Sequence, residues 1–256
     1  MMRALGHLPD HADEVADDLQ HRHVGQLIGA APFAVPASVD YSDRVGPIPD
    51  QGGSSSCVGN ALSTAVLVRS DLAGHRMTRP SRKAIYDVAR LIDDPRAAMH
   101  DQGSRPRAAI VGMTDYGLVA EDRWPLTDSN VNQAPPLDVF QHGLDAMVTG
   151  HYRIASGPGC AALIRMALAK GFCPCFALQV DQDFMSYTGG VYLGGGKGLG
   201  GHYLCCVGYG DGFVRVVNSW GAGWGESGFV RVADAVLDSM AVSDVLVVTT
   251  VPLEVV

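Results

Sequence analysis

The sequence places one cysteine, Cys57, where a reactive thiolate could form. Glycines and serines precede it, and the serines can cap the first turn of a helix that apolar spacing predicts from Cys57 to about Leu72. The first turn of a helix carries unpaired N–H groups and a partial positive charge, and both lower the pKa of a thiol. Cys57 is therefore a candidate nucleophile for covalent catalysis.

A thiolate nucleophile needs a proton acceptor beside it, and His202 is the candidate. It follows Gly200 and Gly201 and begins a strand-like apolar run, HYLCCVGYG. Asn218 lies sixteen residues further on, in the run NSWGAGWGESGFVRV. Taken singly, His202 could equally be a core histidine, and Asn218 a cap at the end of a strand. Their joint occurrence with a helix-opening cysteine favours catalysis.

The other five cysteines predict neither a metal site nor disulfides. Cys173 and Cys175 form a C-P-C pair, and Cys205 and Cys206 a C-C pair, without the C-x2-C spacing of zinc sites. Both pairs lie in apolar runs, and disulfides are rare in a chain of this length without a secretion signal. We interpret these four as small buried thiols, and Cys160, which opens a helical run, as a packing residue.

The elements that must position these residues change period half-way along the chain. Helices are predicted in the first half at 12–28, 57–72, 81–92, 106–115 and 136–148. A helix at 160–170 follows, and then β-rich runs separated by glycine turns: CPCFALQV, HYLCCVGYG, FVRVVNSW, GFVRVAD and VLVVTTVP. A mainly helical part therefore carries Cys57, and a β-rich part carries His202.

Composition excludes several classes of function. The 256 residues are 47% hydrophobic and 18% charged, which is enough to bury a large core. A net charge of −8 argues against nucleic acid as a partner, and no apolar run is long enough for a membrane helix. The mildly apolar stretch 24–37 follows acidic residues, whereas a signal peptide begins with basic ones. We expect a cytoplasmic protein; release or association with a particle by a non-classical route is the alternative.

Three separated blocks resemble the papain-like (family C1) cysteine peptidases, of the bacterial type. The first is Gln51-Gly52, with Cys57 six positions after the glutamine. The second is Gly201-His202 leading into CCVGYG, and the third is the NSWG run that begins at Asn218. Each block is a weak motif alone, but the three in this order are specific. The resemblance covers roughly residues 36–235 and includes PASVDYSDR at 36–44 and DQGSRPRAAI at 101–110.

The resemblance implies a role for each catalytic residue. Cys57 would be the nucleophile and His202 the general base and later the acid, resting as a thiolate–imidazolium pair. Asn218 would orient the imidazole, and Trp220 would cover that hydrogen bond. The Gln51 side chain and the Cys57 N–H would form the oxyanion hole. The reaction implied is peptide-bond hydrolysis through a thioester acyl-enzyme.

The resemblance also implies the fold and the substrate contacts. It predicts an α+β, two-lobe fold with a helical lobe at 39–150, an antiparallel β-barrel-like lobe at 151–256 and the active-site cleft between them. Gly103 and Ser104 would pair with the substrate backbone. Tyr203 would line the pocket for the second substrate residue before the cut, narrowing it or making it more polar. Residues 1–38 are an extension, either a latch over the cleft or a structural segment docked elsewhere.

Ser54, Val58 and Tyr203, which stands where members commonly have a small residue, depart from the family pattern, and three functions stay open. Ser54 and Val58 stand where secreted members have a cysteine and a tryptophan, so the disulfide of that loop is missing. A peptidase acting on peptides or proteins, without metal or organic cofactor, is the first function. The alternatives are an acyltransferase, amidase or peptide ligase on the same dyad, and a catalytically silent papain-fold component that binds or builds structure.

Overall fold

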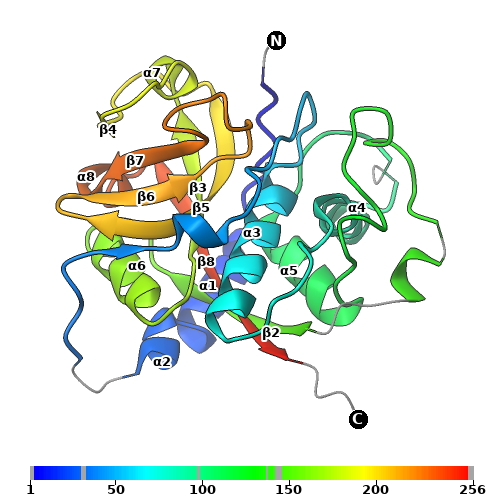
Figure 1. The fold of residues 1–256 in the computed structure, drawn as a ribbon, viewed down its shortest axis with the longest axis horizontal. Coiled ribbons are helices and arrows are strands. Elements are labelled where there is room, and N and C mark those ends of the chain that lie inside the picture. The colour runs from blue at the N-terminus through cyan, green and yellow to red at the C-terminus, as the bar shows by residue number, and fades with distance from the viewer. Residues whose placement is uncertain (1–2, 30–32, 97–98, 137, 142–145, 253–256) are drawn as a thin grey trace.

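In the computed structural model, the helices between residues 57 and 115 lie on one side of the molecule and most of the sheet lies on the other (Figure 1). The structure describes residues 3–29, 33–96, 99–136, 138–141 and 146–252. On one side lie α3 (Cys57–Leu72), α4 (Arg82–Asp93) and α5 (Pro106–Asp115), and on the other an eight-stranded sheet. The fold is α+β, with helices beside a mainly antiparallel sheet, as the resemblance implied.

The helix boundaries follow from local signals. Ser81 caps α4 by accepting a hydrogen bond from the Ala84 N–H, and Pro106 occupies the first turn of α5. Helix α3 is buried on nearly every face because it lies between the sheet and the other two helices. Its first residue, Cys57, is therefore held at the junction of the two sides of the molecule.

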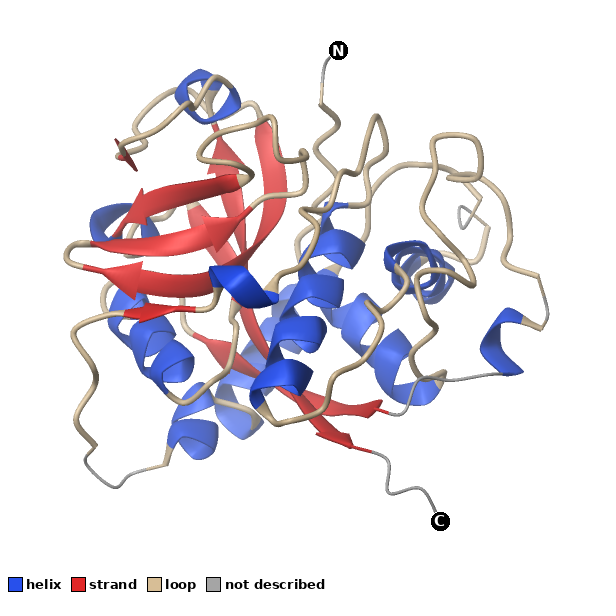
Figure 2. Cartoon of the chain, in the orientation of Figure 1, coloured by secondary structure: helices blue, strands red, loops and turns tan. Residues whose placement is uncertain are grey.

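The sheet has the strand order β2-β8-β3-β5-β6-β7-β4, with β1 paired to β5 (Figure 2). All pairs are antiparallel except β4 with β7. Strand β5 is central and pairs with β3 and β6, which fixes His202 opposite Leu178. The strands are β1 (Val39–Asp40), β2 (Ala146–Ile154), β3 (Cys175–Val180), β4 (Val191–Tyr192), β5 (Gly200–Gly210), β6 (Phe213–Val217), β7 (Phe229–Ala233) and β8 (Val242–Pro252).

Short helices complete the fold around the sheet, and one continuous core joins it to α3. They are α1 (Ala12–His21), α2 (Val24–Ile28), α6 (Cys160–Ala169), α7 (Gln182–Met185), α8 (Asp234–Leu237) and the 3-10 turns Ser42–Arg44 and Val139–Gln141. All six cysteines are buried and free, as small core thiols would be. Within the part of the chain that the structure describes, no helix is long and apolar enough to cross a membrane.

Two predicted helices are wrong. The helix at 136–148 is instead a 3-10 turn, Val139–Gln141, followed by β2 from residue 146, while residues 137 and 142–145 lie outside the described ones. Strand β2 pairs with β8 along its whole length, and this distant pairing outweighs the local pattern. The helix at 12–28 breaks between α1 and α2 because the Arg22 carbonyl accepts a hydrogen bond from the Arg153 N–H.

Candidate active site

Cys57 begins α3 and is fully buried. Ser56 stands at the N-cap, but its side chain makes no capping bond; its hydroxyl accepts instead from the Asn60 side chain at 3.0 Å. The serine cap that the sequence suggested is therefore absent from this helix. The main-chain N–H groups of Tyr203 and Gly6 act to lower the pKa of the Cys57 thiol, which places the thiol close to both β5 and the N-terminal extension.

The structure brings His202 and Asn218 together from β5 and the segment after β6. His202 Nε2 and Asn218 Oδ1 are 2.7 Å apart, and the Trp220 ring stacks on the imidazole at a centroid distance of 4.7 Å. Both side chains are buried, so Trp220 keeps water from the bond between them. His202 Nδ1 has no hydrogen-bond partner among the described residues. It is thus the ring nitrogen left to exchange a proton with a thiol.

Gln51 lies six positions before Cys57 in the chain, and three hydrogen bonds hold its side chain. Its Nε2 donates to the carbonyls of Ser54 at 2.7 Å and Ala4 at 3.1 Å, and its Oε1 accepts from the Ser219 hydroxyl at 2.6 Å. The Ser219 bond fixes which end of the amide is the donor. Gln51 therefore presents an N–H at the site where the resemblance implied an oxyanion donor, and a peptide carbonyl already occupies it.

Burial controls the ionisation of the dyad. It raises the pKa of the Cys57 thiol to about 11, against the opposing effect of the main-chain N–H groups. It also lowers the pKa of His202 to about 4, although the Asn218 hydrogen bond acts in the other direction. Both groups are therefore neutral at pH 7 in this closed chain. The thiolate–imidazolium pair stays a prediction for a chain in which water reaches the dyad.

An extended segment, residues 3–9, lies across these residues between the helical and sheet sides; we call it the strap (Figure 1). The His7 N–H donates to the Gly201 carbonyl at 3.2 Å. Ser104 bonds the strap twice, donating to the Gly6 carbonyl at 3.0 Å and accepting from the Leu8 N–H at 3.1 Å. The Gly103–Ser104 segment thus pairs with an extended backbone, as the resemblance implied for substrate.

Glycines allow the strap to lie this close. A Cβ on Gly6 would come within 1.8 Å of the Ser55 carbonyl oxygen, and one on Gly103 within 2.2 Å of the Gly6 oxygen. Gly103 also has a φ of +91°, which other residues rarely adopt. The main chain of the strap therefore lies directly against the main chain at Ser55 and at Gly103.

Tyr203 is buried behind the strap. Its hydroxyl donates to the main-chain carbonyl of Asp244 at 3.0 Å, and its ring stacks on His7 at a centroid distance of 5.9 Å. His7 Nε2 in turn lies 2.8 Å from Asp244 Oδ2. Sequence reasoning missed both His7 and Asp244, because they are 237 residues apart and neither lies in a motif.

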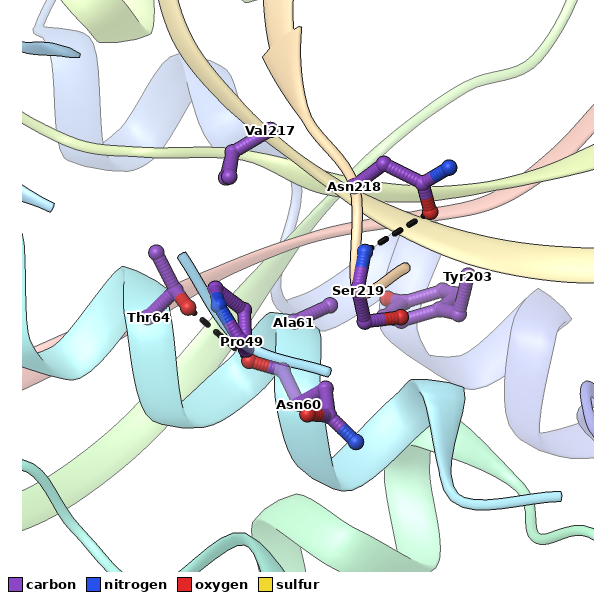
Figure 3. A pocket seen from close by; sticks show the side chains of 8 residues that line it. All are labelled: Pro49, Asn60, Ala61, Thr64, Tyr203, Val217, Asn218 and Ser219. Carbon is purple, nitrogen blue, oxygen red and sulfur yellow. Dashed lines mark hydrogen bonds between the residues drawn. The ribbon is translucent and has the colours of Figure 1, made fainter. Parts of the chain in front are cut away.

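A narrow space lies behind the dyad, between α3 and the segment that carries Asn218 (Figure 3). It has no room for a water molecule, and Asn218 Nδ2 has no hydrogen-bond partner among the described residues. The back of the site is therefore dry. Over the described ranges, no group of three or more histidine, cysteine or acidic side chains could hold a metal ion.

Comparison with known proteins finds a matching family and several relatives. The family model for papain family cysteine proteases matches residues 35–249. An uncharacterised peptidase C1-like protein of Acanthamoeba polyphaga mimivirus is 29% identical over 194 residues, and papain of Carica papaya 25% over 209. These alignments cover 70% and 77% of this chain. They span 62% and 55% of the length of the two relatives, so the chain matches less than two thirds of each.

Solved structures share the fold. Xylellain, a cysteine protease from Xylella fastidiosa, superposes with a TM-score of 0.79 at 23% identity, covering 97% of both chains. Bromelain from Ananas comosus superposes with a TM-score of 0.69 at 22% identity, covering 84% of this chain and 99% of its own. At these identities the likeness establishes the fold and not the chemistry.

Proposed function

The chain belongs to the papain family of cysteine proteases, and we propose that it hydrolyses peptide bonds with Cys57 as the nucleophile. His202 Nδ1, which has no partner among the described residues, takes the thiol proton. The sulfur then attacks the substrate carbonyl carbon and forms a tetrahedral intermediate. Asn218 holds the imidazole in place through its bond to Nε2.

The intermediate then collapses to a thioester and is hydrolysed. Gln51 Nε2 and the Cys57 N–H stabilise the oxyanion. The C–N bond breaks as His202 gives its proton to the leaving amine. Water, deprotonated by His202, attacks the thioester, releases the acid and restores the thiol. Every proton in this cycle passes through the His202 imidazole, whose Nδ1 has no partner among the described residues.

The observation that carries this proposal is the way the site binds the extended backbone of the strap. The Gln51 side chain and the main chains of Ser104 and Gly201 all bond main-chain atoms of the strap, so these bonds do not depend on the strap's side chains. A surface that binds an extended peptide backbone beside a cysteine–histidine pair is what a peptidase requires.

We propose further that the strap keeps this chain inactive until it is displaced. It buries Cys57 completely and puts the Ala4 carbonyl against the oxyanion donor. A substrate can bind only after the strap has left.

The test is digestion of a mixed peptide library by the full-length chain, with Cys57→Ala as the control. We expect cleavage by the Gly6→Ala chain, in which the strap is displaced, little or none by the native chain, and none by the Cys57→Ala counterpart of either. Adding an amine to the same assay separates hydrolysis from acyl transfer, because a transferase would yield products of increased mass.

The closed site also supports a second candidate, a catalytically silent component with the papain fold. It is favoured by the complete burial of Cys57 under the strap. Reaction of Cys57 with iodoacetamide in the Gly6→Ala chain, without cleavage of any library peptide, would support this candidate instead of the peptidase.

A further inference from the structure

One peptide group in the loop before α3, the one that joins Ser54 to Ser55, is hydrogen-bonded at both ends. Its carbonyl oxygen, on Ser54, accepts from Gln51 Nε2 at 2.7 Å. Its N–H, on Ser55, donates to both carboxylate oxygens of Asp101, at 2.9 Å and 3.1 Å. Hydrogen bonds that act in series through one polar group strengthen one another. The Ser54–Ser55 peptide therefore connects the Asp101 carboxylate to the Gln51 amide.

The Asp101 carboxylate is held in turn by Tyr86, a fully buried residue of α4. The Tyr86 hydroxyl donates to Asp101 Oδ1 at 2.7 Å and accepts from the Gly103 N–H at 3.0 Å. Because the Gly103 N–H can only donate, the hydroxyl proton must point to Asp101. Burial, and next the hydrogen bond to Asp101, raise the pKa of Tyr86 above its usual range, so the hydroxyl keeps this proton. Oδ1 thus accepts from Tyr86 and from Ser55 at the same time.

Helix α4 holds both Tyr86 and the residue before Asp101. The Arg90 guanidinium carbon lies 4.1 Å from the centroid of the Tyr86 ring, and Arg90 Nη1 donates to the His100 carbonyl at 2.9 Å. Gly59 lets α4 lie close to α3, because a Cβ at this position would come within 2.5 Å of a main-chain oxygen of α4. The carboxylate is therefore anchored on the helical side of the molecule.

The Gln51 side chain depends on the Ser54 carbonyl for its orientation. Its Nε2 carries two N–H groups, and the closed chain offers it two acceptors, the carbonyls of Ser54 and Ala4. The N–H that meets Ala4 is the one left for a substrate oxyanion once the strap has gone. The N–H that meets Ser54 stays bonded and sets the plane of the amide, so the Ser54 carbonyl orients the oxyanion donor.

We propose that Asp101 is a positioning residue for the reaction: its carboxylate fixes the Ser54–Ser55 peptide, and this peptide orients the Gln51 amide toward the substrate oxyanion. Asp101 acts through Gln51 and takes no part in bond making or proton transfer. Hydrogen bonds must hold this loop in place, because all six cysteines are free and no disulfide ties it down. The inference rests on the proposed peptidase function and adds a residue to it.

The first test measures kcat and KM with one peptide in the full-length Gly6→Ala chain, whose strap is displaced. Adding Asp101→Ala should lower kcat about tenfold and change KM less than about twofold, because an oxyanion donor acts mainly in the transition state. Asp128→Ala is the matched control, since its carboxylate accepts from the Gly53 N–H of the same loop at 3.3 Å, in a different peptide group. Equal losses in the two variants, or a loss confined to KM, would overturn the inference.

A double-mutant cycle separates positioning of Gln51 from a general loosening of the loop. If Asp101 acts only through Gln51, adding Asp101→Ala to a Gly6→Ala chain that already carries Gln51→Ala should change kcat less than about twofold. A further tenfold loss in that chain would contradict the inference.

The conservative variant Asp101→Asn tests the bond itself. It keeps one side-chain oxygen that can accept from both Ser55 and Tyr86, and a neutral acceptor is only moderately weaker than a charged one. In the Gly6→Ala chain it should therefore keep kcat within about threefold of the value with Asp101 intact. A loss as large as that in Asp101→Ala would count against positioning by this bond.

A further readout needs no peptide cleavage. The Gln51 side-chain amide gives a pair of signals in the 1H–15N NMR spectrum of the native full-length chain, identified by their absence from Gln51→Ala. We expect Asp101→Ala to shift this pair and Asp128→Ala to leave it in place. Unmoved signals in a folded Asp101→Ala chain would exclude the link to Gln51. A shift together with no cleavage by the Gly6→Ala chain would instead remove the peptidase proposal and leave this link standing.

Discussion

Gln51 Nε2 donates a hydrogen bond of 3.1 Å to the main-chain carbonyl of Ala4, forty-seven residues before it in the chain. The same N–H is the one proposed to stabilise the substrate oxyanion. The chain therefore satisfies its oxyanion donor with its own backbone, and catalysis requires exchange of one carbonyl for another. This relationship ties inhibition and catalysis to a single amide group.

Replacing Gln51 by alanine in the Gly6→Ala chain, whose strap is displaced, should lower kcat by about 10²- to 10³-fold. The effect on KM should be small, because the donor acts mainly in the transition state. Ser219→Ala is the matched control, since it removes the hydroxyl that orients Gln51 but keeps the donor. Steady-state kinetics on one peptide would measure both. A Gln51→Ala chain as active as the Ser219→Ala chain would contradict the role of the amide.

Gly6→Ala should displace the strap without altering any catalytic side chain. The added Cβ would lie 1.8 Å from the Ser55 carbonyl oxygen, which is part of the rigid entrance to α3. We expect alkylation of Cys57 to accelerate at least about tenfold, measured by peptide mapping after iodoacetamide. Gly223→Ala, where a Cβ meets nothing within 4 Å, is the control and should react at the native rate.

The pH dependence of that alkylation should differ between the closed and open chains. Burial raises the pKa of Cys57 to about 11 and lowers that of His202 to about 4 in the closed chain, so its rate should rise into the alkaline range. In the Gly6→Ala chain water reaches both groups, and the thiolate–imidazolium pair should give a high rate already near pH 7. Superimposable pH profiles would mean that the strap does not control the ionisation of the dyad.

Acid should weaken the docking of the extension. Burial alone would raise the pKa of Asp18, but the His151 hydrogen bond and the nearby cationic groups outweigh it and lower that pKa; His7 and Arg153 likewise lower that of Asp244. A carboxylate with a lowered pKa stabilises the fold above its unfolded pKa of about 4, and this contribution is lost as the pH falls further. Burial raises the pKa of Asp10, so this carboxyl has the opposite effect on acid stability. It is one group against the two with lowered pKa values, Asp18 and Asp244.

Thermal unfolding between pH 3 and 7 would measure this effect. We expect the melting temperature of the native chain to fall below about pH 4 and that of Asp18→Asn to fall less steeply, from a lower value at pH 7. The Asp18→Asn chain should be less stable at pH 7 by about 1–3 kcal/mol, because Arg153 and His151 lose a buried partner. Parallel curves for the two chains would exclude Asp18 as a source of the acid sensitivity.

Local signals sufficed for some parts of this molecule. The helix at Cys57–Leu72 and the Ser81 cap were predictable because apolar spacing and capping act within a few residues. Strand β2 was not predictable, because its pairing with the distant strand β8 imposes it. The break between α1 and α2 was not predictable either, because a hydrogen bond from the distant Arg153 imposes it. Local sequence patterns leave the placement of the extension open for the same reason. Whether residues 3–9 fit the site depends on the contact of Gly6 with Ser55 and Gly103, which no local pattern encodes.

The bonds between Gln51 and Ser219 constrain how the strap can leave. The Gln51 main-chain N–H donates to the Ser219 carbonyl at 2.8 Å, and the Gln51 side chain accepts from the Ser219 hydroxyl. These two bonds connect the wall that carries Gln51 to the wall that carries Ser219, beneath the strap. A hinge motion that separates the two walls would break these bonds, which hold Gln51 in place. We therefore expect the strap to detach first at Arg3, because its ion pair with Asp50 is partly exposed to solvent. The strap would then detach residue by residue from Arg3 onward, and the rate of the first step would depend on salt concentration because salt screens the exposed ion pair.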